Sequence, residues 1–514
     1  MIHISPSKSE FIRNAKAGDV SPVYAGLPFI SPRRIYENFQ SAHSFLLESI
    51  KGPEKIARYS FIGAGPFLIF RVKDGNVEVE DRRKGSGVRP ESTRAEGQGS
   101  GITGAPLKKL KELLSAHKIK SPENLPPFVG GAVGLISYDF VRYFENIPGT
   151  AVDDLNIPDA HFMLFDSVIA VDRKLQKTFL MSCPLISADA GAGLKPALSE
   201  WEDAYDRACE KIKIMFEKIS LIPSTPPAGA GLKPVPANTP IHIRHEMGKE
   251  AYMEIVKRAK EYIRAGDIFQ ANLSQRVSAD IGDIGPWQIY KILSGINPSP
   301  FAAYLDLGQY HIASSSPERL VKVTGRIVET RPIAGTRPRG KDAEGDFMMR
   351  KDLLLNEKER AEHLMLIDLE RNDLGKISGY STVEVDEFMI TEDYSHVIHI
   401  VSNIRGALAN GKDCFDAIRA TFPGGTITGV PKVRCMEIID ELEPVARGPY
   451  TGSVGYISFT GDMDLNIVIR TFVIKDKVAY VQAGAGIVAD SDPEREYLET
   501  LKKAEALVRT LETL

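Results

Sequence analysis

The amino-acid sequence predicts a mixed α+β sandwich rather than a doubly wound parallel sheet. Strand following strand, with helices only between groups of strands, favours this architecture over alternating βαβ units. The common nucleotide-binding signatures also fail, because AGAGIV does not match GxGxxG and GTITGVPK does not match GxxxxGK[ST]. The segments that read as successive strands are residues 270–280, 301–307, 311–316, 320–324 and 326–335.

The first part of the chain, residues 1–185, is expected to add strands to the same sandwich. Residues 68–80 alternate apolar and polar side chains around Asp74-Gly75, a dipeptide typical of tight hairpin turns. Residues 162–172 form an apolar run that predicts one buried strand.

Residues 186–244 look like a linker that contains one helix. The tract AGAGLKPAL at 190–198 returns as AGAGLKPVP at 228–236, and apolar residues recur at helical spacing from Trp201 to Phe216. A Gly/Pro tract on both sides of one helix is typical of a tolerated insertion, so no functional residue is expected there.

Three helices are predicted in the remaining part, residues 245–514. Residues 250–265 form an amphipathic helix that Gly266 ends. A second helix covers residues 349–375, and its apolar residues surround the turn after Leu364. The third begins at Asp492-Pro493, a capping residue followed by proline at the first helical position.

Composition excludes several functional classes. The 514 residues are 43% hydrophobic and 26% charged with a formal net charge of −4, so no nucleic-acid footprint is present. No apolar stretch approaches the length that spans a bilayer, and the first residues lack a signal-peptide pattern. The four cysteines have neither CxxC nor metal-ligand spacing. We therefore expect a soluble enzyme of the reducing cytoplasm.

Two pairs of glutamates indicate a site for a hard cation. Glu359 and Glu362 lie three residues apart on one predicted helix, and Glu496 and Glu499 repeat this spacing on the C-terminal helix. Residues three apart share a helix face, and Mg²⁺ takes oxygen ligands and often bridges to an anionic substrate. The structural alternatives are that Glu362 pairs with an arginine such as Arg360 or Arg371 and that the second pair faces solvent.

Glycine-rich segments indicate a pocket for a dianion. Glycine lets backbone N–H groups approach a ligand closely, and a helix start such as the one after Pro431 leaves N–H groups unpaired. Each segment alone is more often a plain turn, but several together are more specific. The residues assigned to the pocket are Arg331, Gly335, Thr336, Arg337, Arg339, Thr426, Thr428, Lys432, Arg470, Gly484 and Gly486.

Two further residues are candidates for proton chemistry. Glu318 follows a predicted strand in SSSPERL and is a plausible acid, unless it merely pairs with Arg319. His399 lies in EDYSHVIHIVSN, which reads as either a strand or a helix. A lone histidine in such a segment is also often a core residue with satisfied hydrogen bonds.

Taken together, these motifs resemble the chorismate-utilising enzymes, which include anthranilate synthase component I and aminodeoxychorismate synthase component I. The resemblance runs from about residue 245 to 514 through ETRPIAGT, NEKERAEHLMLIDLERNDLG and FPGGTITG, and more weakly through SFLLES and RYSFIG. It implies two stacked, mainly antiparallel sheets surrounded by helices, formed by residues 1–185 and 245–514 as one interwoven domain.

The resemblance implies roles for single residues. Mg²⁺, which binds the ring carboxylate of chorismate in this family, would be held by Glu362 and Glu499, with Glu359 and Glu496 nearby. Glu318 matches the general acid that assists loss of the C4 hydroxyl.

Further matched positions surround the substrate. Thr336 and His399 join Glu318 as expected catalytic residues, and His399 matches the histidine beside the ring. The positions matched to substrate binding are Gly335, Thr336, Tyr450, Arg470, Gly484, Ala485 and Gly486.

The resemblance makes ammonia the nucleophile. A separate glutamine amidotransferase subunit would supply it, because no cysteine here sits in a nucleophile elbow. FPGGTITG and the NEKERAEHLM segment look like the aminodeoxychorismate branch, so that product is favoured. Ala334 stands where many members of that branch have a lysine that adds covalently at C2, and this makes anthranilate the alternative product.

Three further comparisons with the family concern regulation and other reactions. Ser49 in LLES and the segment around Pro300, Phe301 and Ala302 resemble the tryptophan site of anthranilate synthases, where tryptophan would inhibit or be held structurally. Gln270 stands where isochorismate and salicylate synthases have a lysine base, which disfavours those reactions. A non-catalytic sensor would have lost the acid or the metal ligands, but all of them are present.

Overall fold

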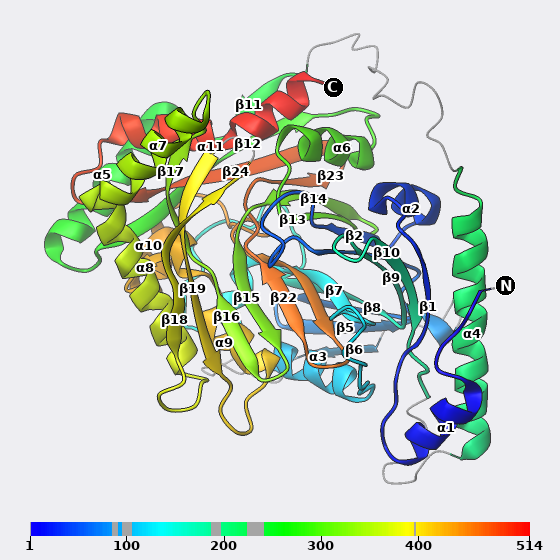
Figure 1. Ribbon diagram of the computed structural model, residues 1–514. Helices are drawn as coiled ribbons and strands as arrows, with labels where there is room; N and C mark the ends of the chain where they lie inside the picture. The colour runs from blue at the N-terminus through cyan, green and yellow to red at the C-terminus, as the bar shows by residue number, and fades with distance from the viewer. Residues whose placement is uncertain (1, 85–90, 95–104, 187–196, 224–240, 395–396) are drawn as a thin grey trace.

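The computed structural model contains two sheets of 12 strands each, and every ladder within them is antiparallel (Figure 1). The predicted α+β class with two antiparallel sheets and surrounding helices is therefore confirmed. The described residues are 2–84, 91–94, 105–186, 197–223, 241–394 and 397–514.

The first sheet joins strands from both parts of the chain. Its spatial order is β1 (Val23–Pro28), β10 (Lys177–Ser182), β9 (Ser167–Asp172), β3 (Tyr59–Ala64), β2 (Ser44–Glu48), β13 (Phe301–Asp306), β14 (Tyr310–Ser316), β23 (Thr471–Lys475), β24 (Val478–Ile487), β12 (Gln270–Asp280) and β11 (Ile243–His245), with β20 (Gly429–Val430) also on β12. The two parts meet where β2 pairs with β13, with Leu46 opposite Tyr304.

The second sheet is also antiparallel and also takes strands from both parts of the chain. Its order is β17 (Ile333–Pro338), β19 (Val397–Ala407), β16 (Ile327–Thr330), β15 (Arg319–Thr324), β22 (Met463–Asn466), β21 (Ser453–Ser458), β7 (Gly131–Ile136), β8 (Ala160–Phe165), β4 (Leu68–Lys73), β5 (Asn76–Asp81) and β6 (Glu91–Arg94), with β18 (Glu384–Asp393) on the other side of β19. The hairpin predicted at Asp74-Gly75 joins β4 and β5.

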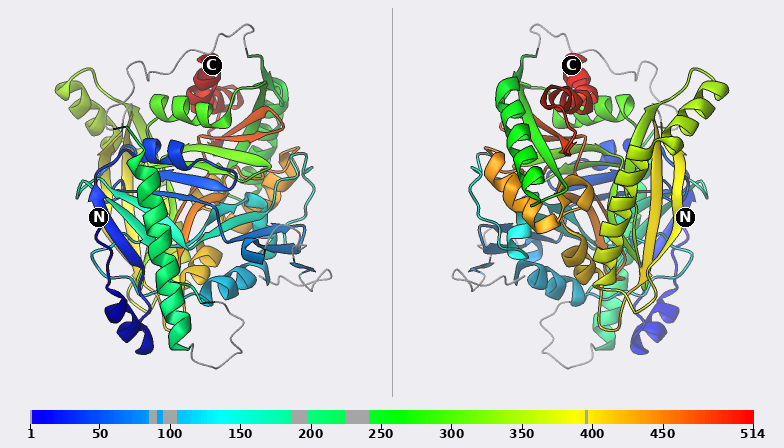
Figure 2. Two further views of the ribbon diagram at one scale, coloured as in Figure 1. Left: turned by 90° about the vertical axis from the view of Figure 1, so that its right-hand side faces the viewer. Right: turned by 90° about the vertical axis from the view of Figure 1, so that its left-hand side faces the viewer.

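Helices surround the two sheets (Figure 2). They are α1 (Lys8–Lys16), α2 (Pro32–Phe39), α3 (Ala105–Ser115), α4 (Leu198–Ser220), α5 (Lys249–Ala265), α6 (Pro286–Ile296), α7 (Ala343–Leu355), α8 (Glu357–Gly375), α9 (Cys414–Thr421), α10 (Lys432–Leu442) and α11 (Pro493–Glu512), with short 3₁₀ turns η1 (Arg82–Lys84), η2 (Tyr138–Tyr143) and η3 (Gly425–Ile427). The helix expected inside the linker is α4, whereas most of the duplicated Gly/Pro tract lies outside the described residues.

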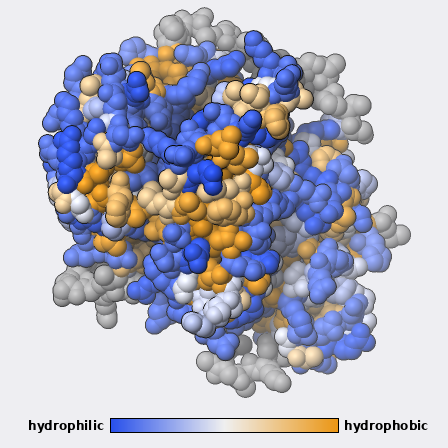
Figure 3. Space-filling view, turned by 60° about the vertical axis from the view of Figure 1, so that its left-hand side comes forward, coloured by the Kyte–Doolittle hydropathy of each residue, from blue (hydrophilic) through white to orange (hydrophobic). Residues whose placement is uncertain are grey.

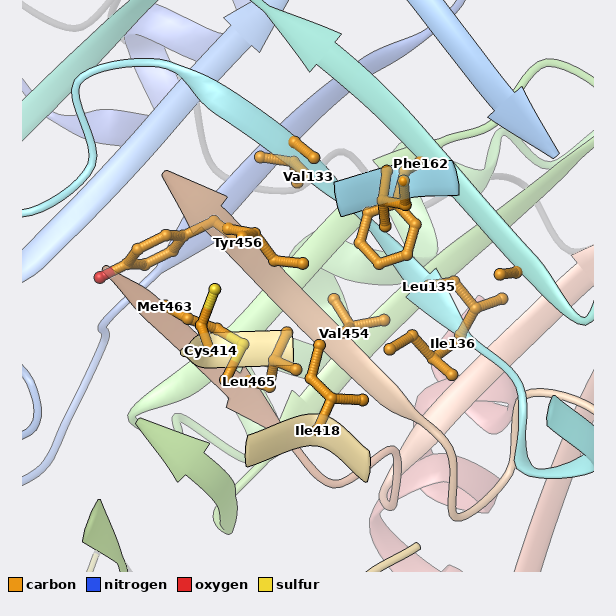
Figure 4. Close-up of a cluster of buried hydrophobic side chains, with 14 of the residues drawn as sticks. Val133, Leu135, Ile136, Phe162, Cys414, Ile418, Val454, Tyr456, Met463 and Leu465 are labelled. Carbon is orange, nitrogen blue, oxygen red and sulfur yellow. The ribbon is translucent and has the colours of Figure 1, made fainter. Parts of the chain in front are cut away.

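Side-chain alternation along the strands produces separate apolar cores. On β2, Phe45 faces the core shared by the two sheets, whereas Leu46 faces the helices outside the first sheet. A close-up of buried hydrophobic side chains shows α9 lying against the second sheet, with Cys414 and Ile418 near Met463 and Leu465 (Figure 4). A third core holds α5 and α10 against β12 and β24. This packing fixes the frame on which the site is built.

Two predicted strands were wrong because each is divided. The run 162–172 is not one strand: β8 and β9 belong to different sheets, and the chain changes sheet at Asp166. The run 326–335 is divided by Pro332, which has no N–H to donate to a ladder. Apolar content alone could not reveal these breaks, because apolar residues continue on both sides of each break.

The predicted helix over 349–375 was also wrong in its continuity. Asn356 interrupts it, and its side chain accepts a hydrogen bond from the Glu359 N–H, which starts α8 as a new helix. Leu364 is 45% exposed, so the turn after it is buried on only part of its circumference.

None of the described helices is long and apolar enough to cross a membrane. Figure 3 shows hydrophobic residues gathered in the middle of the face that carries α7 and α8. The exposed large apolar side chains of these helices are Phe347, Met348, Leu355 and Leu364.

Candidate active site

Glu318 lies at the point where the chain passes from β14 of the first sheet to β15 of the second. It is 7% exposed, and its Oε1 accepts a hydrogen bond from Thr426 Oγ1 at 2.8 Å. Burial raises the pKa of Glu318 to about 7. The structural alternative was wrong, because Arg319 pairs with Asp464 instead. Glu318 is thus a carboxyl that can hold a proton near neutral pH.

His399 lies on a strand, β19, beside Thr336 of β17. Its Nδ1 is 3.0 Å from Thr336 Oγ1 and 3.2 Å from the Gly335 carbonyl oxygen. Because a carbonyl only accepts, the hydrogen-bond network assigns the proton to Nδ1 and leaves Nε2 as an acceptor. Burial lowers the pKa of His399 to about 4, so the ring is neutral.

Gly335 occupies an irregular point in the β17–β19 ladder, between Ala334 and Thr336. Its φ of +69° is in the left-handed region that favours glycine, and an added Cβ would lie 3.0 Å from Glu359 Oε2. Glycine is therefore required both by the backbone conformation and by the close approach of α8.

The two expected glutamate pairs lie on α8 and α11. Gln270 Nε2 donates to Glu362 Oε1 at 3.3 Å, so Glu362 bonds an amide rather than Arg360 or Arg371. Burial raises the pKa of Glu362, and the carboxylates of Glu359 and Glu499 raise it further.

Repulsion between acids from different helices means that α8 and α11 present their carboxylates to a common space. Oxygen donors held against their own repulsion suit a hard cation in chemical type. As the side chains stand, however, no three His, Cys, Asp or Glu residues of the described ranges converge closely enough to hold a metal ion.

Lys503 is a site residue that the sequence reasoning missed. Its Nζ lies 2.8 Å from Glu499 Oε1 and donates to the Gly484 carbonyl at 3.0 Å. Its charge also lowers the pKa values of Glu318 and Glu362, though burial dominates both. The spacing of Glu499 and Lys503 looks like an ordinary surface pair on a helix, so only the fold reveals its position.

Gly484 and Gly486 lie within β24 and face the site, whereas Ala485 points into the core below α5. β23 pairs only with Val478–Val481 of β24, so the later part of this strand has no partner on that edge among the described strands. An added Cβ would lie 2.9 Å from Tyr450 Oη at Gly484 and 2.5 Å from Gln270 Nε2 at Gly486. Glycine at these positions lets the Tyr450 hydroxyl and the Gln270 amide lie against the backbone of β24.

Most cations assigned to the anion pocket are paired with carboxylates in this structure. Lys432 Nζ lies 2.5 Å from Asp373, and Thr428 is fully buried and bonds the Gly424 carbonyl. Thr426 donates to Glu318 rather than to a free anion. The remaining paired cations are Arg331, Arg337 and Arg339.

Arg470 differs from these cations. No carboxylate of the described residues pairs with its guanidinium group, and burial lowers its pKa. Its charge acts on both Tyr450 and His399, which places it within electrostatic range of both. A partly desolvated guanidinium without a carboxylate partner in the described ranges is suited to an anionic ligand.

The four residues expected at an effector site line one cavity of about 280 Å³. Ser49, Pro300, Phe301 and Ala302 lie on its wall, together with Lys55. The cavity is separate from the carboxylates of α8 and α11.

The fold and this site define an enzyme with a buried proton donor, an unpaired arginine and acidic helices around one opening. A family model described as chorismate binding enzyme matches residues 65–509. The chain belongs to this family of chorismate-binding enzymes.

Known relatives agree with this membership. Anthranilate synthase component 1 of Acetivibrio thermocellus is 42% identical over 99% of this chain and 98% of that protein. Aminodeoxychorismate synthase component 1 of Bacillus subtilis (strain 168) is 42% identical over 91% of this chain and 92% of that protein. The crystal structure of anthranilate synthase component I from Streptococcus pneumoniae TIGR4 covers 93% of this chain and 98% of its own, with a TM-score of 0.73 and 34% identity.

Proposed function

We propose that this enzyme aminates chorismate with ammonia, with Glu318 as the general acid. The observation that carries the proposal is the buried, unpaired carboxyl of Glu318, whose pKa is raised to about 7. Protonated Glu318 gives its proton to the C4 hydroxyl as that group leaves, and ammonia supplies the new C–N bond. Family membership and two 42%-identical relatives with synthase names support this reaction.

In this proposal, the enzyme binds chorismate through its two carboxylates. Arg470 and Tyr450 bind one carboxylate of chorismate, and the backbone at Gly484 and Gly486 lies against the other. Mg²⁺ would be held by Glu362 and Glu499, aided by Glu359 and Glu496, and would supply positive charge for the ring carboxylate. His399 and Thr336 border the ring from the second sheet.

The proposed product is 4-amino-4-deoxychorismate, the precursor of p-aminobenzoate. The segments FPGGTITG and NEKERAEHLMLIDLERNDLG support this choice, as does the similarity to the B. subtilis aminodeoxychorismate synthase component.

Anthranilate is the second candidate product, and two observations favour it. Ala334, 8% exposed at the end of the site, offers no nucleophile for a covalent adduct at C2. The cavity at Ser49 is open, as a tryptophan site would require, and we propose tryptophan as its ligand.

Ammonia is proposed to come from a glutamine amidotransferase subunit. The names of the relatives, each called component 1, support a second component. The exposed apolar side chains of α7 and α8 give such a subunit a hydrophobic surface beside the glutamates of α8.

Product analysis with chorismate, Mg²⁺ and an ammonium salt tests the proposal. We expect a product that an added aminodeoxychorismate lyase converts to p-aminobenzoate. Fluorescent anthranilate would overturn the product but keep the amination, and unchanged chorismate would overturn both. Glu362→Gln should abolish turnover, whereas Glu357→Gln, an exposed acid on the same helix, should leave it intact.

A further inference from the structure

The carboxylate of Glu392 lies beside His399 and has no role in the reaction described above. In the ladders of β19, His399 lies opposite Thr336 of β17 on one side and opposite Glu392 of β18 on the other. Directly opposite residues project to the same face of a sheet. Glu392 and Thr336 therefore flank the imidazole.

The carboxylate of Glu392 forms an ion pair with an arginine that is equally buried. Arg331 and Glu392 are each 5% exposed, and Arg331 Nη2 lies 2.5 Å from Glu392 Oε1. The same nitrogen lies 2.6 Å from Glu387 Oε2. Removing one partner of such a buried pair leaves an uncompensated charge, which has a large effect on its neighbours.

Tyr394 connects this ion pair with the imidazole. Its hydroxyl donates to Glu392 Oε2 at 3.2 Å, while its ring meets the His399 ring edge-on with centroids 5.2 Å apart. The polar end of Tyr394 is thus anchored to Glu392, and its apolar face limits rotation of His399.

The charges around His399 are balanced by this arrangement. Burial lowers the pKa of His399 and Arg470 lowers it further, whereas Glu392 raises it. If Arg331 no longer neutralised Glu392, the carboxylate would favour an imidazolium ion, which donates from both nitrogens. The acceptor at Nε2 would then be lost.

We propose that Arg331, Glu392 and Tyr394 are positioning residues that hold the His399 imidazole neutral and fixed beside Thr336. The unit extends to the effector cavity, because Lys55 Nζ lies 2.6 Å from Glu387 and 3.4 Å from Glu392. The proposal rests on the proposed function only in taking His399 as part of the substrate site.

The first test follows the protonation of His399 without any turnover. NMR titration of the histidine-labelled protein is compared for Arg331→Met and Arg331→Lys, with the signal assigned by its loss in His399→Gln. We expect the titration midpoint to rise by about one pH unit or more in Arg331→Met and to stay near its original value in Arg331→Lys. In the double variant Arg331→Met/Glu392→Gln, the titration midpoint of His399 should return towards its original value. A midpoint that stays unchanged in folded Arg331→Met would overturn the proposal.

Kinetics provides the second measurement. Tyr394→Phe removes only the hydroxyl, and we expect kcat to fall about tenfold with an almost unchanged KM for chorismate. Arg405→Met is the matched control, since Arg405 also lies on β19 and pairs with a carboxylate of β18 but is half-exposed. Equal losses in both variants would count against a positioning unit.

The outcomes separate this inference from the proposed function. If Arg331→Met does not fold, Glu392→Gln replaces it in the NMR titration and should lower the His399 midpoint, since it removes the charge that raises it. A shifted midpoint in a protein that does not aminate chorismate would overturn the proposed function alone. An unshifted midpoint in an active enzyme would overturn the positioning unit alone.

Discussion

Two buried carboxylates in this molecule differ in every partner they have. Glu443 is 3% exposed and accepts from the backbone and hydroxyl of Ser274 and from Arg447, which is itself buried. Glu318 is 7% exposed but accepts a single side-chain hydrogen bond, from Thr426. The first acid has both oxygens engaged by hydrogen-bond donors, and the second is left able to take up a proton. Incomplete pairing in a buried region therefore marks the group that does chemistry.

The largest expected effect is the loss of activity in Glu318→Gln. Glutamine keeps the size and the bond from Thr426 but cannot give up a proton, so kcat should fall by about 10² to 10⁴. Ammonia-dependent turnover of chorismate is the measurement, and Glu329→Gln, an acid on β16 paired with Lys322, is the control. Turnover near the original rate would remove Glu318 from the proton step.

Glu443→Gln should damage stability instead of the proton step. The change leaves the Arg447 guanidinium buried without its counter-charge, and we expect the free energy of unfolding to fall by about 3–5 kcal/mol. Denaturant unfolding measures this effect. The exposed neighbour Glu441→Gln should change it by less than about 1 kcal/mol, and similar losses in both variants would erase the contrast with Glu318.

Glu318→Gln should act on stability in the opposite direction. The folded pKa of about 7 is above the ordinary value of 4.5, so the folded protein holds this proton more tightly than the unfolded chain. The cost of ionising Glu318 is absent below about pH 4.5 and fully present above pH 7. At pH 8 the variant should gain about 2–3 kcal/mol in free energy of unfolding. A loss at pH 8 would contradict the raised pKa.

The smallest effect is expected in the pH dependence of the unmodified enzyme. With unprotonated ammonia held constant, kcat/KM for chorismate should fall about tenfold per pH unit above pH 7, because the acid must be protonated. This decrease above pH 7 should be absent from the residual activity of Glu318→Gln. A flat profile from pH 6 to pH 9 would argue that another group supplies the proton.

The sequence predicted the fold class, but not how the charges of the candidate site are paired. Alternation and turn residues revealed the strands, and the spacing of Glu359 with Glu362 and of Glu496 with Glu499 revealed two acidic helix faces. Sequence could not assign partners to cations. Lys432 looked free and is paired with Asp373, whereas Arg470 has no carboxylate partner in the described ranges.

Long-range pairing explains these misses. Lys503 looked like half of an ordinary helix pair, and its approach to Gly484 depends on how α11 lies across β24. Glu392 and Tyr394 gave no signal, because their connection to His399 requires the register of β18 on β19. Such registers follow from the packing of the whole sheet, not from local residues.

Lys55 gives the molecule a property that neither of its pockets has alone. It lines the cavity at Ser49 and, through Glu387 and Glu392, touches the group that holds His399. An occupant that drew this ammonium ion away from Glu387 and Glu392 would couple the cavity to the group around His399, and thermodynamic reciprocity would then require the substrate to change the occupant's affinity by the same factor. Feedback in this chain would therefore be a two-way exchange, readable from either end.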